Sequence, residues 1–332
     1  MLKKISSIGS IVIPTIIAAA LITIMLLRVW DDLIVSIQYI VPIWLVLAAA
    51  VCVCGWFLRG FRYKYILKKL ETNIGVIFSS ACIYVSQTAN IIIPARLGDF
   101  VRMFILKHEK QTPYTKGFTS LIAERVYDIL TVAFLGLCTL PFLADVISEE
   151  HRWFIYVILA VLLAGVIGIV ILIAAKHLHA ENIILKKILE IFEQFRTVSS
   201  TFFSVLHLSG LSIIIWLSDM VICYLVSLMF GADINFILII FAVVIGNLVK
   251  AVPITPGGIG TYEVALLVVF EIGGVPAATA TLIAVVDHLI KNLVTLFGGV
   301  VSIYYFGDWV LSLFNRLFKG GRKFVKEENG NS

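Results

Sequence analysis

The sequence predicts an all-α polytopic membrane protein with six transmembrane helices and two re-entrant helical hairpins. Of its 332 residues, 60% are hydrophobic and only 14% are charged, and a water-soluble domain of this size needs a far more polar surface. Residues 155–175 contain no Asp, Glu, Lys or Arg. Such a run can cross the hydrocarbon layer, which takes about 20 residues at ~1.5 Å each.

Eight apolar segments follow one another along the chain, and six of them read as simple spans. These six are residues 8–27, 39–58, 118–143, 153–175, 208–230 and 277–306. The first follows two lysines, but it is longer than the about 7 to 15 residues of a signal-peptide core, so we expect a retained span. All five cysteines fall in apolar segments, which predicts apolar packing rather than disulfides.

Lys and Arg in the connecting segments set the expected orientation. Most of them fall in five groups that alternate with acid-rich loops: residues 3–4, 59–69, 107–116, 176–196 and 316–326. Because basic loops stay on the cytoplasmic side, we expect a multi-pass protein of the cell membrane with both termini in the cytoplasm.

The two remaining apolar segments, residues 74–106 and 236–273, are interrupted in the middle by Pro and Gly. The orientation rule places the flanks of each segment on a single face, so each must enter and leave from the same side. The first would bend at residues 94–99 and the second at residues 253–260. Non-helical backbone at membrane depth has to be buried in protein or line a wet cavity, so each bend predicts a cavity.

The two halves of the chain resemble each other. Pro-Ala-Arg-Leu-Gly at 94–98 precedes Leu-Ile-Ala at 121–123, and Pro-Gly-Gly-Ile-Gly at 256–260 precedes Leu-Ile-Ala at 282–284. We therefore expect residues 1–150 and 151–306, each with one re-entrant hairpin, to form the inverted repeat that transporters use. Residues 181–206 are amphipathic and are expected on the membrane surface, and residues 307–332 form a basic cytoplasmic tail.

Charged residues at membrane depth cost about 2.5 to 3.5 kcal/mol each on insertion scales, so each needs a partner or a purpose. Glu124, Arg125 and Asp128 share one side of the third simple span, because they are three and four residues apart. They are either an ion cluster that orients this helix or part of a ligand site, and the sequence favours neither.

Arg96, Asp99 and Arg102 surround the first bend. Arginines beside the free N–H groups of a half-helix suit a phosphate, through charge-assisted hydrogen bonds and the helix dipole. Alternatively, Arg96 pairs with Glu124 or Asp128 and locks the hairpin. The anion site is the interpretation we follow, because the bend keeps guanidinium and amide groups together.

A second candidate cluster surrounds the second bend. Its members at the bend and in the following turn are Thr255, Gly257, Gly258, Gly260, Tyr262 and Glu263. Glycines allow the backbone to approach a ligand closely. Asp287 and Lys291, four apart, are expected to neutralise each other; Lys250 is then available for an anion or for Glu263, and Asp219 could face the same cavity.

The motifs of several enzyme classes are missing: there is no His-Glu-x-x-His, Gly-x-Ser-x-Gly or Cys-x-x-Cys. We therefore name no catalytic residue, metal site or cofactor, and we expect a transporter rather than an enzyme. His177 and His179 are expected at a membrane edge, and His288 is expected to serve in packing.

Three motifs, in this order, resemble the family of the lysylphosphatidylglycerol synthase transmembrane region, also called flippase-like domains, over about residues 8–306. They are Pro94-Ala-Arg-Leu-Gly-Asp, then Glu124-Arg125 with Asp128, then Pro256-Gly-Gly-Ile-Gly with Glu263. Members of this family stand alone or are fused to an aminoacyl-lipid synthase or a glycosyltransferase domain. The resemblance implies handling of an anionic lipid across the membrane, and with no soluble domain of either kind expected here, it does not imply a transferase.

The leading hypothesis is transbilayer movement of a phosphate-headed lipid, either a phospholipid or a polyprenyl-phosphate carrier. Arg96, Arg125 and Lys250 would bind the headgroup, with Glu124 and the acids Asp128 and Glu263 as counter-charges or proton partners. Two rivals are a membrane enzyme acting on lipid-linked sugar and a non-catalytic partner of a glycosyltransferase or lipid-modifying enzyme. Nucleic acid is not an expected partner. The identity of the lipid, the direction, the energy source, the oligomeric state and the need for a partner enzyme stay open at this level.

Overall fold

The computed structural model describes residues 16–27, 41–143, 183–252 and 254–307, with a few isolated positions besides. Within these ranges the chain is helical and contains no strand. The expected span at 153–175, the basic tail beyond 313 and the two histidines 177 and 179 lie outside the described residues. The labelled elements are α3 (Pro42–Lys69), α4 (Val76–Ile92), η1 (Pro94–Phe100), α5 (Val101–Lys110), α6 (Tyr114–Leu143), α8 (Ile183–Val198), α9 (Phe202–Met229), α10 (Phe236–Ala251), η3 (Pro256–Gly258), α11 (Thr261–Ile272) and α12 (Ala277–Phe306).

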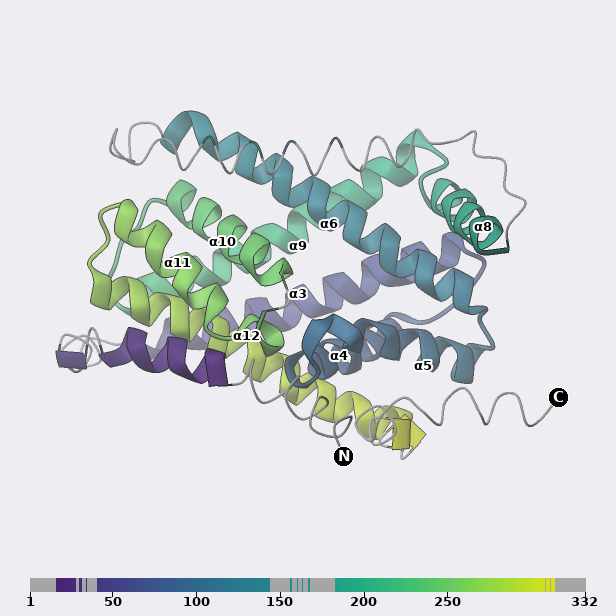
Figure 1. Cartoon of the computed structure of the whole chain (residues 1–332), viewed down its shortest axis with the longest axis horizontal. Helices are drawn as coiled ribbons and strands as arrows, with labels where there is room; N and C mark the ends of the chain where they lie inside the picture. The colour runs from purple at the N-terminus through teal and green to yellow at the C-terminus, as the bar shows by residue number, and fades with distance from the viewer. Residues whose placement is uncertain are drawn as a thin grey trace.

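Three described helices are long and apolar enough to cross a membrane: α3, α9 and α12. At ~1.5 Å per residue, their 28 to 30 residues exceed the ~30 Å of a hydrocarbon layer. The long helices α3, α6 and α9 cross the molecule along its long axis (Figure 1). The shorter apolar helices are Ile16–Leu27, α4 and α10.

Helix boundaries differ from the hydropathy prediction in two places. The span expected at 39–58 continues as α3 to Lys69, so Arg59 and Arg62 lie on a helix and not in a basic loop, and Arg62 is buried. The amphipathic segment expected at 181–206 is divided, because Thr201 caps a new helix, its side chain accepting from the Ser204 N–H at 3.2 Å. Residues 202–206 therefore belong to α9, whereas α12 has the bounds expected for the last span.

Both interrupted segments are broken where the sequence predicts. In the first, α4 ends at Ile92 and a 3₁₀ turn begins at Pro94, which has no N–H to continue the helix. The chain then turns back on itself: Gly98 packs so closely on Asn90 that a side chain there would meet its backbone nitrogen. Asp99 stabilises this reversal of the chain, because its carboxylate accepts a hydrogen bond from the side-chain amide of Asn90 at 2.8 Å.

The second break lies between α10 and α11, which pack against each other. Gly257 and Gly260 have positive φ angles of 64° and 86°, a region that glycine enters without steric cost. The two bends meet in the middle of the fold, where η3 contacts both η1 and α4. At this contact a Cβ on Gly257 would lie 3.4 Å from the Ile91 Cα.

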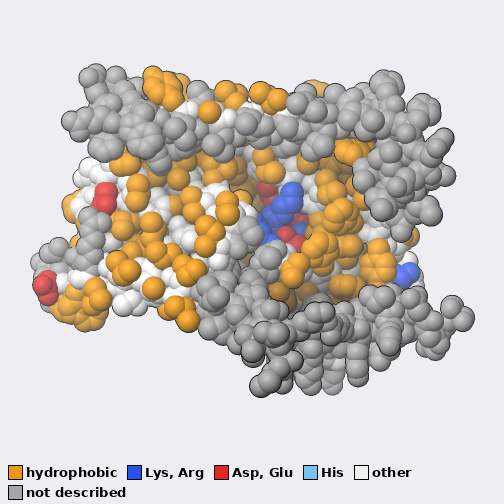
Figure 2. All heavy atoms as spheres, in the orientation of Figure 1, with side chains coloured by type: hydrophobic (Ala, Val, Ile, Leu, Met, Phe, Trp, Pro, Cys, Tyr) orange, Lys and Arg blue, Asp and Glu red, His pale blue; other side chains and the backbone are white. Residues whose placement is uncertain are grey.

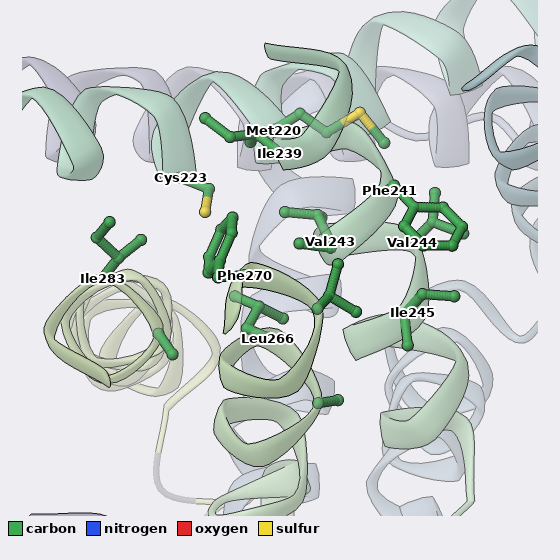
Figure 3. Close-up of a cluster of buried hydrophobic side chains, with 14 of the residues drawn as sticks. Met220, Cys223, Ile239, Phe241, Val243, Val244, Ile245, Leu266, Phe270 and Ile283 are labelled. Atoms are coloured by element: carbon green, nitrogen blue, oxygen red, sulfur yellow. The ribbon is translucent and has the colours of Figure 1, made fainter. Parts of the chain in front are cut away.

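Two apolar clusters flank the meeting point of the bends. The larger one joins α9, α10, α11 and α12 and includes Met220, Phe241, Leu266, Phe270 and Ile283 (Figure 3). The other joins α3, α4 and α5. The five cysteines are free, as expected. Packing is thus apolar on both sides, and the polar side chains gather between the two clusters.

Close helix contacts generate a first prediction. Gly299 on α12 lies against Thr88 of α4, and any Cβ at this position would collide with the threonine side chain. Gly299→Ala should lower the free energy of unfolding by about 1–3 kcal/mol through overpacking. Thermal unfolding of the purified protein in detergent measures the effect. Gly210→Ala, where a Cβ meets open space, is the matched control and should not lower the melting temperature.

Candidate functional site

A cavity of about 590 Å³ lies beside the two bends, between α3, α4, α6, α9 and α12. This volume is typical of small-molecule sites. Figure 2 shows Lys, Arg, Asp and Glu side chains in a hollow near the centre of the face in view, bordered by hydrophobic side chains. The charged residues that line the cavity are Arg59, Arg62, Arg96, Glu124, Arg125, Asp128, Asp219, Lys250 and Lys291.

Glu124 is the centre of a buried ion-pair network. It accepts from Arg102 at 2.5 Å and from Arg62 at 3.3 Å, and Arg62 also donates to Asp128 at 2.7 Å. The side chains of Arg102 and Arg62 are 0% and 1% exposed. The network joins α3, α5 and α6, so the cluster expected on one side of the third span is an ion cluster that also lines the cavity.

Asp99 belongs to the same end of the cavity. It accepts from Arg125 at 2.9 Å and from the side-chain amides of Asn90 and Gln87 at 2.8 and 3.2 Å. Arg125 also lies 3.8 Å from Asp128. Asp99 therefore ties the first bend to α4 and α6, while the Arg125 side chain stays 34% exposed at the cavity.

Arg96 lines the cavity but makes no ion pair or hydrogen bond with any residue that the structure describes. The alternative in which it pairs with Glu124 or Asp128 is not observed, because Arg62 and Arg102 occupy those carboxylates. Its φ angle is 54°, in the left-handed region that costs a residue with a Cβ about 1–2 kcal/mol. The bend thus holds a guanidinium at the cavity that has no ion-pair partner among the described residues.

Lys250 is the first member of a chain of three contacting side chains. Its Nζ lies 3.0 Å from His288 Nε2, and His288 Nδ1 lies 2.7 Å from Glu263 Oε1. With the Nδ1 proton donated to the carboxylate, Nε2 is left to accept from the ammonium group. The other oxygen of Glu263 accepts from the Gly260 N–H at 2.7 Å. Lys250 also lies over the ring of Tyr262.

Two further charged pairs lie at the cavity, one within α12 and one between α3 and α9. Lys291 and Asp287 pair at 2.8 Å, as expected from their spacing, and Tyr262 donates to Asp287 at 2.8 Å. Arg59 pairs with Asp219 at 2.6 Å. Asp219 lines the cavity, in agreement with the sequence analysis.

The structure brings most of the predicted site residues to one cavity. Those that line it are Arg96, Glu124, Arg125, Asp128, Lys250, Thr255, Gly257, Gly258, Tyr262 and Lys291. The others stand behind the lining and hold it through the contacts described above: Asp99, Arg102, Gly260, Glu263 and Asp287.

Sequence reasoning missed several residues of the site. Arg59 and Arg62 were counted as loop residues, although their three-residue spacing would place both on one side of a continued helix. His288 was expected to serve in packing, and no local pattern marks the contact with Glu263, 25 residues away. Neutral polar groups at the cavity, such as Asn247 and Asn292, carry no sequence signal of their own.

The apolar helical bundle described above is the architecture of a membrane protein, and its cavity is lined by charged side chains. The chain belongs to the family of the lysylphosphatidylglycerol synthase TM region, which it matches over residues 11–299. It is similar to Glycosyltransferase AglD of Haloferax volcanii, at 33% identity over 77% of this chain and 48% of that protein. The chain thus spans about half the length of that relative.

Two further relatives are UPF0104 membrane proteins. One is from Methanothermobacter thermautotrophicus, with 23% identity over 81% of this chain and 87% of that protein. The other is from Methanocaldococcus jannaschii, with 25% identity over 64% of this chain and 92% of that protein. The family resemblance read from the motifs is therefore confirmed.

The buried network generates a second prediction. Arg102→Met removes one of the two partners of Glu124 and leaves that carboxylate undercompensated, which should cost about 3–5 kcal/mol of stability. Unfolding of the purified protein by SDS titration measures the loss. The control is Lys116→Met, which breaks the pair with Glu71, a side chain that is 86% exposed; this change should stay within ~1 kcal/mol.

Proposed function

We propose that this protein binds the phosphate headgroup of an anionic lipid in the cavity and moves it across the bilayer. The observation that carries the proposal is the uncompensated guanidinium of Arg96, in a cavity whose described carboxylates are paired with other cations. Arg96 is half-buried, and a charge partly removed from water is unfavourable without a partner. A bound phosphate would compensate it and accept two parallel hydrogen bonds from the guanidinium.

Three further groups support a phosphate at this place. Lys250 uses one of its three ammonium protons for His288 and keeps two for a ligand. The side chain of Arg125 is one-third exposed at the cavity despite its ion pairs. Gly257 and Gly258 also line the cavity, and the Lys250 side chain packs where a Cβ on Gly258 would lie, so this glycine makes room for the lysine at the site.

The movement rests on the two broken helices. Each half has the same order of elements, a short apolar helix, a bend, a second short helix and a long closing helix. In each, an acid of the bend or of the helix that follows it contacts the closing helix: Asp99 contacts Arg125 on α6, and Glu263 contacts His288 on α12. We propose that these units are the re-entrant hairpins of an inverted repeat, entering from opposite faces, with both termini cytoplasmic. Rocking of such units around a fixed midplane site exposes it to each side in turn.

A third prediction concerns Arg96. Arg96→Gln keeps a polar side chain but removes the charge, and with it charge-assisted hydrogen bonds worth roughly 1.5–3 kcal/mol. Translocation of a labelled phosphatidylglycerol in proteoliposomes should fall more than about tenfold. Lys68→Gln, which removes an exposed lysine at the end of α3, should leave the rate unchanged. Equal rates for the two variants would refute a headgroup role for Arg96.

A fourth prediction tests the chain that holds Lys250. His288→Phe retains a ring but leaves the ammonium without its acceptor, so headgroup binding should weaken roughly three- to tenfold, or ~1 kcal/mol. His288→Gln can still accept from Lys250 and donate to Glu263, and it should restore most of the affinity. Binding is measured by lipid titration in native mass spectrometry. If the two variants lose affinity equally, the position of Lys250 does not depend on this bridge.

A second candidate function is that of a membrane partner of a glycosyltransferase, without transport of its own. It is favoured by the similarity to the relative named Glycosyltransferase AglD, of which this chain matches about half. Affinity purification of the intact protein from mild detergent decides between the two. Stable recovery of a glycosyltransferase, together with no lipid movement by the purified protein, would favour the partner role.

A further inference from the structure

We propose that the cavity selects phosphate esters whose remaining headgroup carries hydroxyl groups, and that it rejects headgroups that carry an ammonium group. This inference rests on the proposed function and names the substrate class of the same site. It follows from an account of which charges around the cavity are already compensated and which are free.

The carboxylates that could receive a ligand ammonium are occupied. Among the described residues that line the cavity, Glu124 and Asp128 pair with Arg62, and Asp219 pairs with Arg59. The acids behind the lining are paired or bridged as well: Asp99 with Arg125, Asp287 with Lys291, and Glu263 with His288. A ligand ammonium would have to share a carboxylate that already has a partner, which weakens its own attraction, or displace that partner and leave a buried cation uncompensated.

Two of the charged groups at the cavity that keep unused hydrogen-bond donors are Arg96 and Lys250, and both are cations. Arg96 has five unused N–H donors, and Lys250 has two beyond its bond to His288. These groups attract phosphate oxygens and repel an ammonium group that lies next to the phosphate. For a headgroup with both charges, the same cavity therefore binds one end and disfavours the other.

The polar groups that remain are neutral. Asn292 lines the cavity without a hydrogen bond to any described residue. Asn247 uses its amide nitrogen for the Val243 carbonyl, so its side-chain oxygen is available. Amide groups pair with hydroxyls without needing a charge. Glycerol and sugar headgroups both supply such hydroxyls beside a phosphate.

The test is a lipid titration of the purified full chain, read by native mass spectrometry. Four lipids are compared: phosphatidylglycerol, phosphatidylethanolamine and lysyl-phosphatidylglycerol with the same acyl chains, and a polyprenyl-phosphate hexose. We expect at least one of the two hydroxyl-bearing, ammonium-free lipids to bind about tenfold or more tightly than both ammonium-bearing lipids. Whichever of these two lipids binds more tightly shows whether the preferred hydroxyl groups belong to a glycerol or to a sugar headgroup.

Two variants distinguish an effect of carboxylate pairing on headgroup selectivity from a general loss of lipid binding. Arg59→Gln leaves Asp219 unpaired at the cavity, so it should gain affinity for phosphatidylethanolamine, by about threefold or more. Arg96→Gln frees no carboxylate, so it should lose affinity for phosphatidylglycerol without any gain for phosphatidylethanolamine. Elution volume and melting temperature in detergent establish that each variant is folded, and if Arg59→Gln is not, the Arg96→Gln comparison and the wild-type lipid series still decide.

Each outcome has a definite meaning. Equal binding of phosphatidylglycerol and either ammonium-bearing lipid overturns the selectivity, even if the protein still translocates lipid. Selective binding without movement in proteoliposomes supports the selectivity and refutes the transport proposal. Absence of binding to all four lipids overturns both.

Discussion

The ion pairs around Glu124 impose the constraint on which the remaining structure depends. Arg62 comes from α3, Arg102 from α5 and Glu124 from α6, and all three side chains are almost completely buried. Charges at such depth are tolerated only with close, well-directed partners, so these three helices have little freedom to shift against one another. The break at Pro94 is part of the same arrangement, because it lets α5 return along α4 and bring Arg102 to Glu124.

In the second half of the chain, the cation Lys250 is positioned by a histidine instead of by a directly contacting carboxylate. Lys250 is connected to Glu263 through the ring of His288, so the cation and the acid do not touch. This leaves the ammonium group less strongly held than the arginines of the first half. A cation that is positioned without being neutralised can serve a ligand, whereas Arg62 and Arg102 serve the fold. Arg96 differs from its arginine neighbours in a similar way, since it lines the cavity without an ion pair to any residue that the structure describes.

The sequence predicted the helical membrane class, both breaks and most of the charged residues at the cavity. These features are local, because Pro and Gly interrupt helices wherever they stand and charged residues are conspicuous in apolar segments. The pairing was less predictable. Asp99 could have met any of several arginines, and which one it meets depends on how α6 packs against the bend. Hydropathy ended the second span at the first charges and so assigned Arg59 and Arg62 to a loop, although helix propensity carries α3 on to Lys69. His288 gave no signal, because its two contacts lie 25 and 38 residues away.

The contact between the two bends has a mechanical consequence. A Cβ on Gly257 of η3 would lie 3.4 Å from the Cα of Ile91, so η3 and α4 pack closely here with no side chain of residue 257 between them. Close-packed interiors transmit strain, so a shift of one hairpin is passed to the other without slack. Under the proposed transport, a movement of one bend that opens the cavity on one side would therefore also displace the other bend.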